Sequence, residues 1–186
     1  MAFVYHLCSP NMRGTTLYPL NGLYDRFPDL YAVERVKYDG REQVLTYQVP
    51  HLGVAWTDTV NLAALDPRLL VAARRRLGVP LSRLLERRLA CIPVERIGDT
   101  PAVVYDSASH WVNSSPGQDV PVAPPDSEFS LFDAATYEEL AEVPPRHLEY
   151  LAERLEHGED ALGFVFVRHV LVAGPLDLSD IELLDL

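Results

Sequence analysis

The chain has 186 residues, of which 48% are hydrophobic and 23% are charged. This composition is typical of a folded globular protein, so we expect one domain over residues 1–186 and exclude a fibrous or wholly disordered chain. No apolar run reaches the roughly 20 residues that a membrane helix needs, and the first residues form no basic leader. We therefore expect a cytoplasmic protein with no membrane partner.

Charge is distributed unevenly along the chain, whose net charge is −11. Residues 67–92 hold seven arginines and one acid, whereas the chain from Asp119 onward holds sixteen acids and three arginines. Such polarity can steer a partner, either a nucleic acid that approaches the basic segment or a second copy of the chain. The alternative is that the arginines form an ordinary solvated helix face. The overall acidity argues against extensive binding to a phosphate backbone.

The first part of the chain shows strand patterns around a loop. Residues 2–8 are aromatic and β-branched, which predicts a first strand. A short helix is expected at 29–37, within a loop-rich section. Alternation with period two then predicts strands at 42–49 and 54–62.

The middle of the chain gives the clearest helix signal. Asp66 suits an N-cap, Pro67 suits the first helical position, and Gly78 suits a C-terminal stop, so a helix is expected between them. A second short helix is expected at 81–89. Brief strands are expected at 91–97 and 102–105.

The last part of the chain begins with a polar stretch at 113–127 that predicts a long loop. Helices are expected at 134–142 and 146–157, followed by a β-rich stretch at 162–173 and a last strand or helix at 178–186. This order favours a single α+β domain with a mixed or antiparallel sheet and flanking helices. The glycine patterns of dinucleotide-binding and P-loop folds are absent from the sequence, so those classes are excluded.

Six histidines and two cysteines are the candidate metal ligands in the sequence. No two histidines have the spacing that places both on one helix face, and both cysteines lie in predicted strands, so no metal site is expected. We expect His147 and His157 to be exposed on a charged helix. His6 and His169 lie in predicted strands, where an ordinary packed histidine is the simplest interpretation.

Two short groups of side chains are candidates for ligand binding. Trp56 and Asp58 lie two apart on a predicted strand, with Asn61 beyond them, which is compatible with a ligand platform or with a packed aromatic beside a turn. Asp126 and Glu128 flank a serine at the end of the long loop. Both acids could reach a cleft, or they could be solvated loop residues.

Three stretches resemble bacterial proteins of the ADP-ribosyltransferase-like type. Tyr5-His6 resembles the first-strand motif of that superfamily, and the segment from Trp56 to Leu69 is similar to one in its DNA-targeting toxins. The segment His169-Val-Leu-Val-Ala-Gly-Pro-Leu176 is similar to a closing pattern in a related small uncharacterised bacterial family. The resemblance covers about a quarter of the chain.

The resemblance implies a split sheet with an NAD cleft between its halves. It implies that His6 holds the nicotinamide ribose, that Tyr18 or Trp56 lies against nicotinamide, and that a late glutamate, best matched by Glu128, stabilises the transition state. On this basis Asp58 and Asn61 join the expected NAD-binding residues, and the expected activity is transfer of ADP-ribose to nucleic acid or protein. No metal is implied. The alternative is a non-enzymatic bacterial protein that acts through self-association or protein binding.

Overall fold

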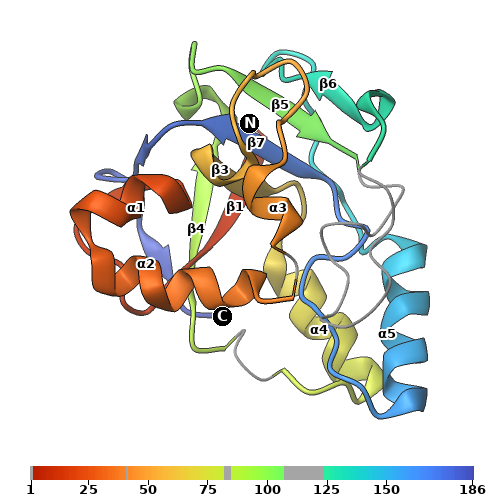
Figure 1. Cartoon of the computed structure of the whole chain (residues 1–186). Helices are drawn as coiled ribbons and strands as arrows, with labels where there is room; N and C mark the ends of the chain where they lie inside the picture. The colour runs from red at the N-terminus through yellow and green to blue at the C-terminus, as the bar shows by residue number, and fades with distance from the viewer. Residues whose placement is uncertain (1, 41, 82–84, 107–123) are drawn as a thin grey trace.

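The computed structural model describes residues 2–40, 42–81, 85–106 and 124–186 as a single α+β domain (Figure 1). In these residues a seven-stranded antiparallel sheet has the strand order β6-β5-β7-β3-β1-β4-β9, and β2 and β8 form a separate two-stranded sheet. The strands are β1 (Phe3–Cys8), β2 (Thr16–Leu17), β3 (Thr59–Ala63), β4 (Arg88–Pro93), β5 (Ala102–Tyr105), β6 (Phe129–Leu131), β7 (His169–Ala173), β8 (Leu176–Asp177) and β9 (Leu183–Leu184). The α-helices are α1 (Leu20–Arg26), α2 (Pro28–Arg35), α3 (Gln43–Thr46), α4 (Pro67–Leu77) and α5 (Pro145–His157).

The helices lie in two groups around the sheet. Helices α1 and α2 lie together on one side of the molecule, and α4 and α5 lie together on another (Figure 1). In the part of the chain that the structure describes, no helix is long and apolar enough to cross a membrane. The seven-stranded antiparallel sheet and its flanking helices confirm the fold class expected from the sequence at the level of a single α+β domain.

The seven-stranded sheet consists of two parts that meet at one point. Strand β1 pairs with β4 from Phe3 to Cys8, and β3 pairs with β7 over its whole length. Between β1 and β3, only Tyr5 and Ala63 are paired. The two parts of the sheet therefore separate directly after this pair.

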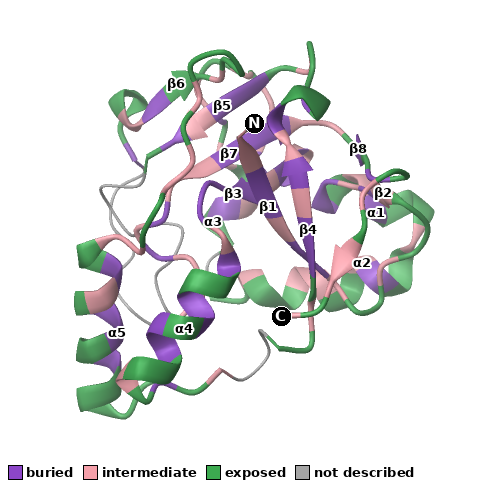
Figure 2. Cartoon of the chain, turned by 180° about the vertical axis from the view of Figure 1, so that it is seen from behind, coloured by how far each residue is buried: buried purple, intermediate pink, exposed green. Residues whose placement is uncertain are grey.

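Both faces of the sheet are covered, as the buried strand residues in Figure 2 show. One core cluster includes Val4, Leu62, Ile92 and Val170, which are fully buried. The strands are consequently rich in aliphatic residues at successive positions, because side chains of both faces need apolar partners.

Helix α4 forms where its capping residues predict it. The Asp66 side chain accepts a hydrogen bond from the backbone N–H of Arg68 at 2.9 Å, and Pro67 occupies the first helical position. The helix ends at Gly78, whose φ of 74° lies in the left-handed region that glycine adopts without a steric penalty. The expected helix is confirmed at both ends.

Helix α5 also forms as expected, but one of its histidines is placed differently. His157 is exposed at the end of the helix, whereas His147 is fully buried. The expectation that His147 is exposed is wrong, because the first turn of the helix packs against the segment that leads into β7. There the His147 ring Nδ1 lies 2.7 Å from the Val165 carbonyl oxygen.

Other expected elements are also wrong. The segment 42–49 forms the short helix α3 instead of a strand, because one helical turn buries Val44 beside Val49 and Trp56. The segment 134–142 forms a turn at 134–136 and then irregular chain, in which Leu140 makes a β-bridge with Leu65, instead of a helix. There the carboxylate of Asp133 accepts hydrogen bonds from Ala135 N and Thr136 Oγ1, which compete with helical bonds.

The remaining expected elements are confirmed in part. The first strand, the strand at 102–105 and the helix at 29–37 form close to their expected bounds, as β1, β5 and α2. Strand β3 begins only after a 3-10 turn at Trp56–Asp58. The helix expected at 81–89 is wrong for the described residues 85–89, which form a turn and then the start of β4 at Arg88. The long loop expected at 113–127 lies mostly outside the described residues.

Candidate functional site

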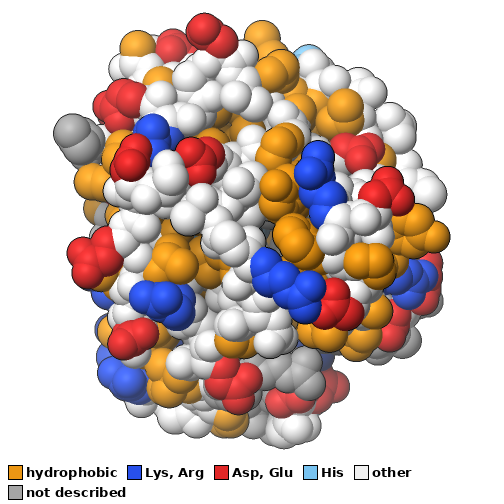
Figure 3. Space-filling model, turned by 90° about the vertical axis from the view of Figure 1, so that its left-hand side faces the viewer, with side chains coloured by type: hydrophobic (Ala, Val, Ile, Leu, Met, Phe, Trp, Pro, Cys, Tyr) orange, Lys and Arg blue, Asp and Glu red, His pale blue; other side chains and the backbone are white. Residues whose placement is uncertain are grey.

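A cavity of about 700 Å³ lies where the two parts of the sheet separate. Its walls are the facing ends of β1 and β3, the helices α1 and α2, and residues 160–164, which precede β7. On the side of the molecule where α1 and α2 lie, hydrophobic side chains reach the surface among charged ones (Figure 3). The volume is within the range of pockets that hold nucleotides and other small molecules.

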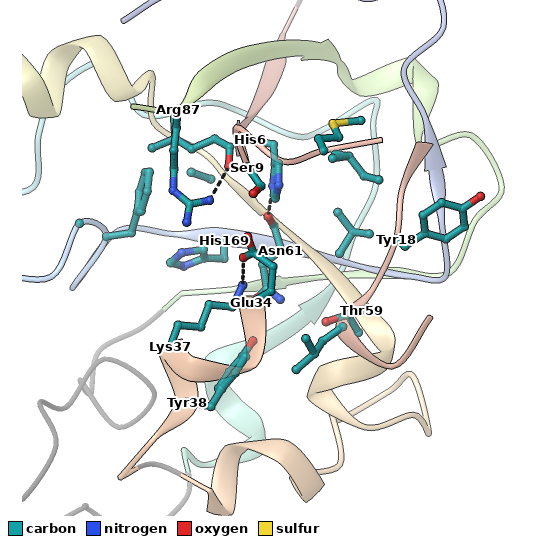
Figure 4. Close-up of a pocket in the computed structure, with 18 of the residues that line it drawn as sticks. His6, Ser9, Tyr18, Glu34, Lys37, Tyr38, Thr59, Asn61, Arg87 and His169 are labelled. Atoms are coloured by element: carbon teal, nitrogen blue, oxygen red, sulfur yellow. Dashed lines mark hydrogen bonds and ion pairs between the residues drawn. The ribbon is translucent and has the colours of Figure 1, made fainter. Parts of the chain in front are cut away.

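Side chains replace sheet hydrogen bonds at the opening between β1 and β3. Continuing the register of the Tyr5–Ala63 pair would place Leu7 opposite Asn61. Instead, the Asn61 carbonyl oxygen lies 2.9 Å from His6 Nδ1, and the Leu7 carbonyl accepts a hydrogen bond from Arg87 Nη1 at 3.3 Å. Figure 4 shows both contacts inside the cavity. Two backbone acceptors that would otherwise lack a partner are thus satisfied while the strands stay apart.

Burial and the contact with Asn61 together determine the charge of the His6 ring and which of its nitrogens carries the proton. Burial lowers the pKa of His6 to about 4, and the positive charges of Lys37 and Arg87 act in the same direction. The ring is therefore neutral at pH 7. Because a carbonyl oxygen can only accept, Nδ1 carries the proton and Nε2 is a hydrogen-bond acceptor.

A carboxylate from α2 also lines the cavity. The Glu34 side chain is only 12% exposed, and one of its oxygens lies 3.5 Å from Lys37 Nζ. Burial raises the pKa of Glu34, but Lys37, a hydrogen bond from Ser9 and the charge of Arg87 together outweigh burial and lower it. Glu34 is consequently an anion at neutral pH, although water has little access to it.

The cavity is more basic than the protein as a whole. Its described lining includes four cationic side chains and two carboxylates, whereas the chain has a net charge of −11. The cations are Arg13, Lys37, Arg74 and Arg87. A basic cavity in an acidic protein favours an anionic ligand over a cationic one.

Aromatic rings line the cavity beside these charges. Trp56 is buried and packs edge-on against Tyr105, with ring centroids 5.7 Å apart. Tyr18 is partly exposed and packs edge-on against Phe27, at 6.0 Å. Both residues also line the cavity, and the Arg26 guanidinium lies over the Tyr18 ring, 5.1 Å from its centroid.

A second histidine lines the cavity from β7. Burial lowers the pKa of His169 to about 4, so its ring is neutral at pH 7. The edge of Phe164 lies against this ring, with centroids 6.2 Å apart. Figure 4 draws His169 among the residues that line the cavity.

A buried arginine holds one wall of the cavity in place. The Arg74 guanidinium is almost fully buried and donates hydrogen bonds to the carbonyls of Pro80, Ala161 and Leu162 at 2.8–2.9 Å. The hydroxyl of Tyr150 accepts a further hydrogen bond from the Leu162 N–H at 2.9 Å. Helices α4 and α5 therefore position the segment that leads into β7.

The structure brings together four of the six residues expected at the site. His6, Tyr18, Trp56 and Asn61 line the same cavity. Asp58 lines a smaller hollow of about 430 Å³ that shares Tyr18 with the main cavity. Its carboxylate accepts hydrogen bonds from Asn21 Nδ2 at 2.7 Å and from Ala55 N at 3.3 Å, which stabilise the turn before β3.

Glu128, the expected late glutamate, lies in the 3-10 turn that precedes β6 at the edge of the sheet. It is not among the described residues that line the cavity. Its backbone carbonyl accepts a hydrogen bond from Asp106 N at 2.9 Å, which joins the ends of β5 and β6.

Sequence reasoning missed several residues of the cavity. Glu34 and Lys37 are three apart near the end of a predicted helix, and Arg87 is one of many arginines in a basic segment. None of them has a motif of its own, so only the folded chain shows that they meet. Within residues 2–40, 42–81, 85–106 and 124–186, no group of three or more histidine, cysteine or acidic side chains is arranged to hold a metal ion.

Comparison of the chain with known proteins finds no significant match. No family model matches the sequence, and no curated protein or solved structure is significantly similar to the chain. The function of the cavity must therefore follow from its own residues.

Proposed function

We propose that the cavity binds NAD or a related nucleotide, and that the protein is an ADP-ribosyltransferase-like enzyme that passes ADP-ribose to nucleic acid or protein. One observation carries this proposal: the sheet opens between β1 and β3, and the first-strand His6 lies in the opening with its Nε2 available to a ligand. A split sheet with a histidine at its first strand is what the resemblance to this superfamily implies.

The chemistry of the lining supports a nucleotide that carries phosphates and sugar hydroxyls. His6 Nε2 can accept a hydrogen bond from a ribose hydroxyl, because its ring is neutral and Nδ1 is the protonated nitrogen. The basic groups of the cavity can bind a pyrophosphate. Trp56 and Tyr18 offer flat surfaces for nicotinamide or adenine.

Calorimetric titration with NAD and with ADP-ribose tests this proposal. The wild type is compared with His6→Asn, in which the amide N–H replaces ring Nδ1 as the donor to Asn61 but no group replaces Nε2. The matched control is His157→Asn, because His157 is exposed on α5. We expect saturable binding by the wild type and by the control, and binding at least about 10-fold weaker by His6→Asn.

The absence of any heat or thermal shift in the wild type would contradict the proposal. It would favour the alternative of a non-enzymatic protein that acts through self-association or protein binding. Equal binding by all three proteins would show that the nucleotide does not contact His6.

The acceptor of ADP-ribose is the second part of the proposal. Helix α4 presents exposed arginines at Arg68, Arg75 and Arg76, the basic surface to which a nucleic acid would bind. Such binding weakens steeply with added salt, because each phosphate contact releases counterions. Salt-insensitive or absent binding of single- and double-stranded DNA and RNA would leave a protein as the acceptor.

A further inference from the structure

The neighbouring helices α4 and α5 carry opposite charges on their exposed sides. Helix α4 exposes Arg75 and Arg76 and contains no acid. Helix α5 exposes Glu149, Glu153 and Glu156, which recur every three or four residues and so follow one face of the helix. In the part of the chain that the structure describes, these five side chains take part in no ion pair. Their charges are therefore available to a partner.

Each helix also exposes a leucine beside its charges. Leu69 on α4 is 37% exposed, and Leu155 on α5 is 45% exposed. Ala72 and Ala152 lie three residues from these leucines and are exposed as well. Small side chains at such positions allow another helix to approach closely. Each helix thus offers an apolar contact with charges around it, which is the composition of a protein interface.

We propose that α4 and α5 join two copies of the chain into a dimer, in which α4 of each copy packs against α5 of the other. The two helices lie next to one another in the molecule, as Figures 1 and 2 show. One two-fold axis therefore forms both contacts at once, and the surface is complementary to itself. This inference goes beyond the proposed function, since it does not require NAD.

The charges and the leucines have different tasks in this dimer. Exposed ion pairs contribute little to affinity, so burial of Leu69 and Leu155 supplies most of the attraction. The arginines of one copy face the glutamates of the other, and this pairing determines which surfaces meet. Because salt screens exposed charges, dimerisation should weaken as the salt concentration rises.

A second copy fits this surface better than a nucleic acid does. The arginines of α4 attract a phosphate backbone, but the glutamates of α5 beside them repel it, and the whole chain has a net charge of −11. A partner that offers both an acidic and a basic helix matches both, and the chain itself is such a partner. The dimer covers the arginines of α4, so a nucleic acid would compete with the second copy for them.

Charge reversal on each helix, followed by mixing, tests the dimer. The acidic variant, Arg75→Glu with Arg76→Glu, has exposed acids on both helices. The basic variant, Glu149→Arg with Glu153→Arg, has exposed arginines on both. Alone, each should dimerise at least about 100-fold more weakly than the wild type, because like charges then face one another. An equimolar mixture should dimerise to within about 10-fold of the wild type, because opposite charges meet at both contacts.

Sedimentation velocity measures dimerisation from about 1 to about 100 μM protein, the range in which weak interfaces dissociate. The matched control is Glu95→Arg with Asp99→Arg, which changes the net charge by the same amount as the basic variant. Both residues are exposed in the turn between β4 and β5. We expect the control to dimerise like the wild type. Raising the salt concentration from about 50 to about 500 mM should weaken both.

The outcomes distinguish the possible partners of this surface. A wild type that remains a monomer overturns the inference, and salt-dependent DNA binding by that monomer would assign the arginines of α4 to a nucleic acid. Dimers of wild-type strength in both reversal variants overturn the assignment to α4 and α5. A mixture that dimerises no better than its components overturns the pairing of the two helices.

The salt series needs no variant and so does not depend on the folding of any. Wild-type dimerisation that does not weaken with salt overturns the charge-paired interface. Restored dimerisation in the mixture also shows that both reversal variants are folded, since each must present its helix to the other.

Discussion

The ring Nδ1 of His6 lies 2.9 Å from the carbonyl oxygen of Asn61, at the point where β1 and β3 separate. In a continuous sheet, a backbone N–H of the neighbouring strand would satisfy this carbonyl. Here a side chain does so instead, and the strands need not close over the cavity. The same contact leaves Nε2 as the unprotonated ring nitrogen of a side chain that lines the cavity, so one histidine would serve both the fold and the proposed nucleotide site.

The two roles of His6 can be separated by substitution. His6→Ala removes the donor to Asn61 and should lower the free energy of unfolding by about 1 kcal/mol. His6→Asn keeps a donor at the position of Nδ1 and should lose less than half of that amount. Urea unfolding of the three proteins measures the difference. Equal loss in both variants would show that the hydrogen bond to Asn61 contributes little to stability.

Trp56 should report the presence of a nucleotide. The chain has two tryptophans, Trp56 and Trp111, so a Trp111→Phe protein has emission from Trp56 alone. Because Trp56 lines the cavity, NAD should change its fluorescence, with a midpoint that matches the dissociation constant from calorimetry. Binding without any change in emission would mean that the nucleotide does not lie against this ring.

Local sequence signals predicted the elements that local interactions form. The cap at Asp66, the proline after it and the glycine at position 78 specify α4 without any tertiary contact. The segment 42–49 shows the opposite case, since its alternating pattern predicts a strand but burial of Val44 beside Trp56 requires a helical turn. The expected exposure of His147 is wrong for a related reason. The polar sequence of a helix does not show which segment packs on its first turn, and His147 is buried there.

The candidate site could be predicted in part, from strand positions for two residues and from the resemblance for Tyr18 and Trp56, which lie outside the strands. His6 and Asn61 belong to β1 and β3, and the cavity includes both. Glu34 and Arg87 reach the cavity from segments that are distant along the chain, and neither has a sequence pattern that indicates a site. Their roles depend on the way the sheet opens, which is a property of the folded chain.

Arg74 should be important for stability and for the shape of the cavity. Arg74→Met removes hydrogen bonds from a buried cation to the carbonyls of Pro80, Ala161 and Leu162, and leaves these acceptors without their donor. We expect a loss of about 2 kcal/mol or more in the free energy of unfolding, and weaker NAD binding because Ala161 and Leu162 line the cavity. Arg75→Met is the control, since Arg75 is exposed on the same helix.

Urea unfolding of both variants measures this loss. A decrease in the free energy of unfolding for Arg75→Met equal to that for Arg74→Met would contradict this account. It would mean that the loss comes from helix charge and not from the buried contacts.

Buried histidines should make the protein sensitive to acid, and His147 provides the cleanest test. Burial lowers the pKa of His147 to about 4, and the nearby charge of Arg74 acts in the same direction, while the bond to the Val165 carbonyl opposes both. Among the described residues, Tyr150 is a further neighbour of His147, with ring centroids 6.1 Å apart. In the unfolded chain the pKa of histidine is about 6.5, so between about pH 6.5 and 4 the unfolded state binds more protons.

The stability of the protein should therefore fall as the pH is lowered from about 6.5 to about 4, by at most on the order of 3 kcal/mol from His147. His6 and His169 contribute in the same direction, since burial lowers the pKa of each to about 4. His147→Asn keeps a donor to Val165 and should flatten the dependence of stability on pH. His157→Asn should leave the acid loss in place, because His157 is exposed and its pKa is raised, mainly by the Glu153 carbonyl. Urea unfolding at several pH values measures all three proteins, and an unchanged slope for His147→Asn would show that His147 is not a source of the acid sensitivity.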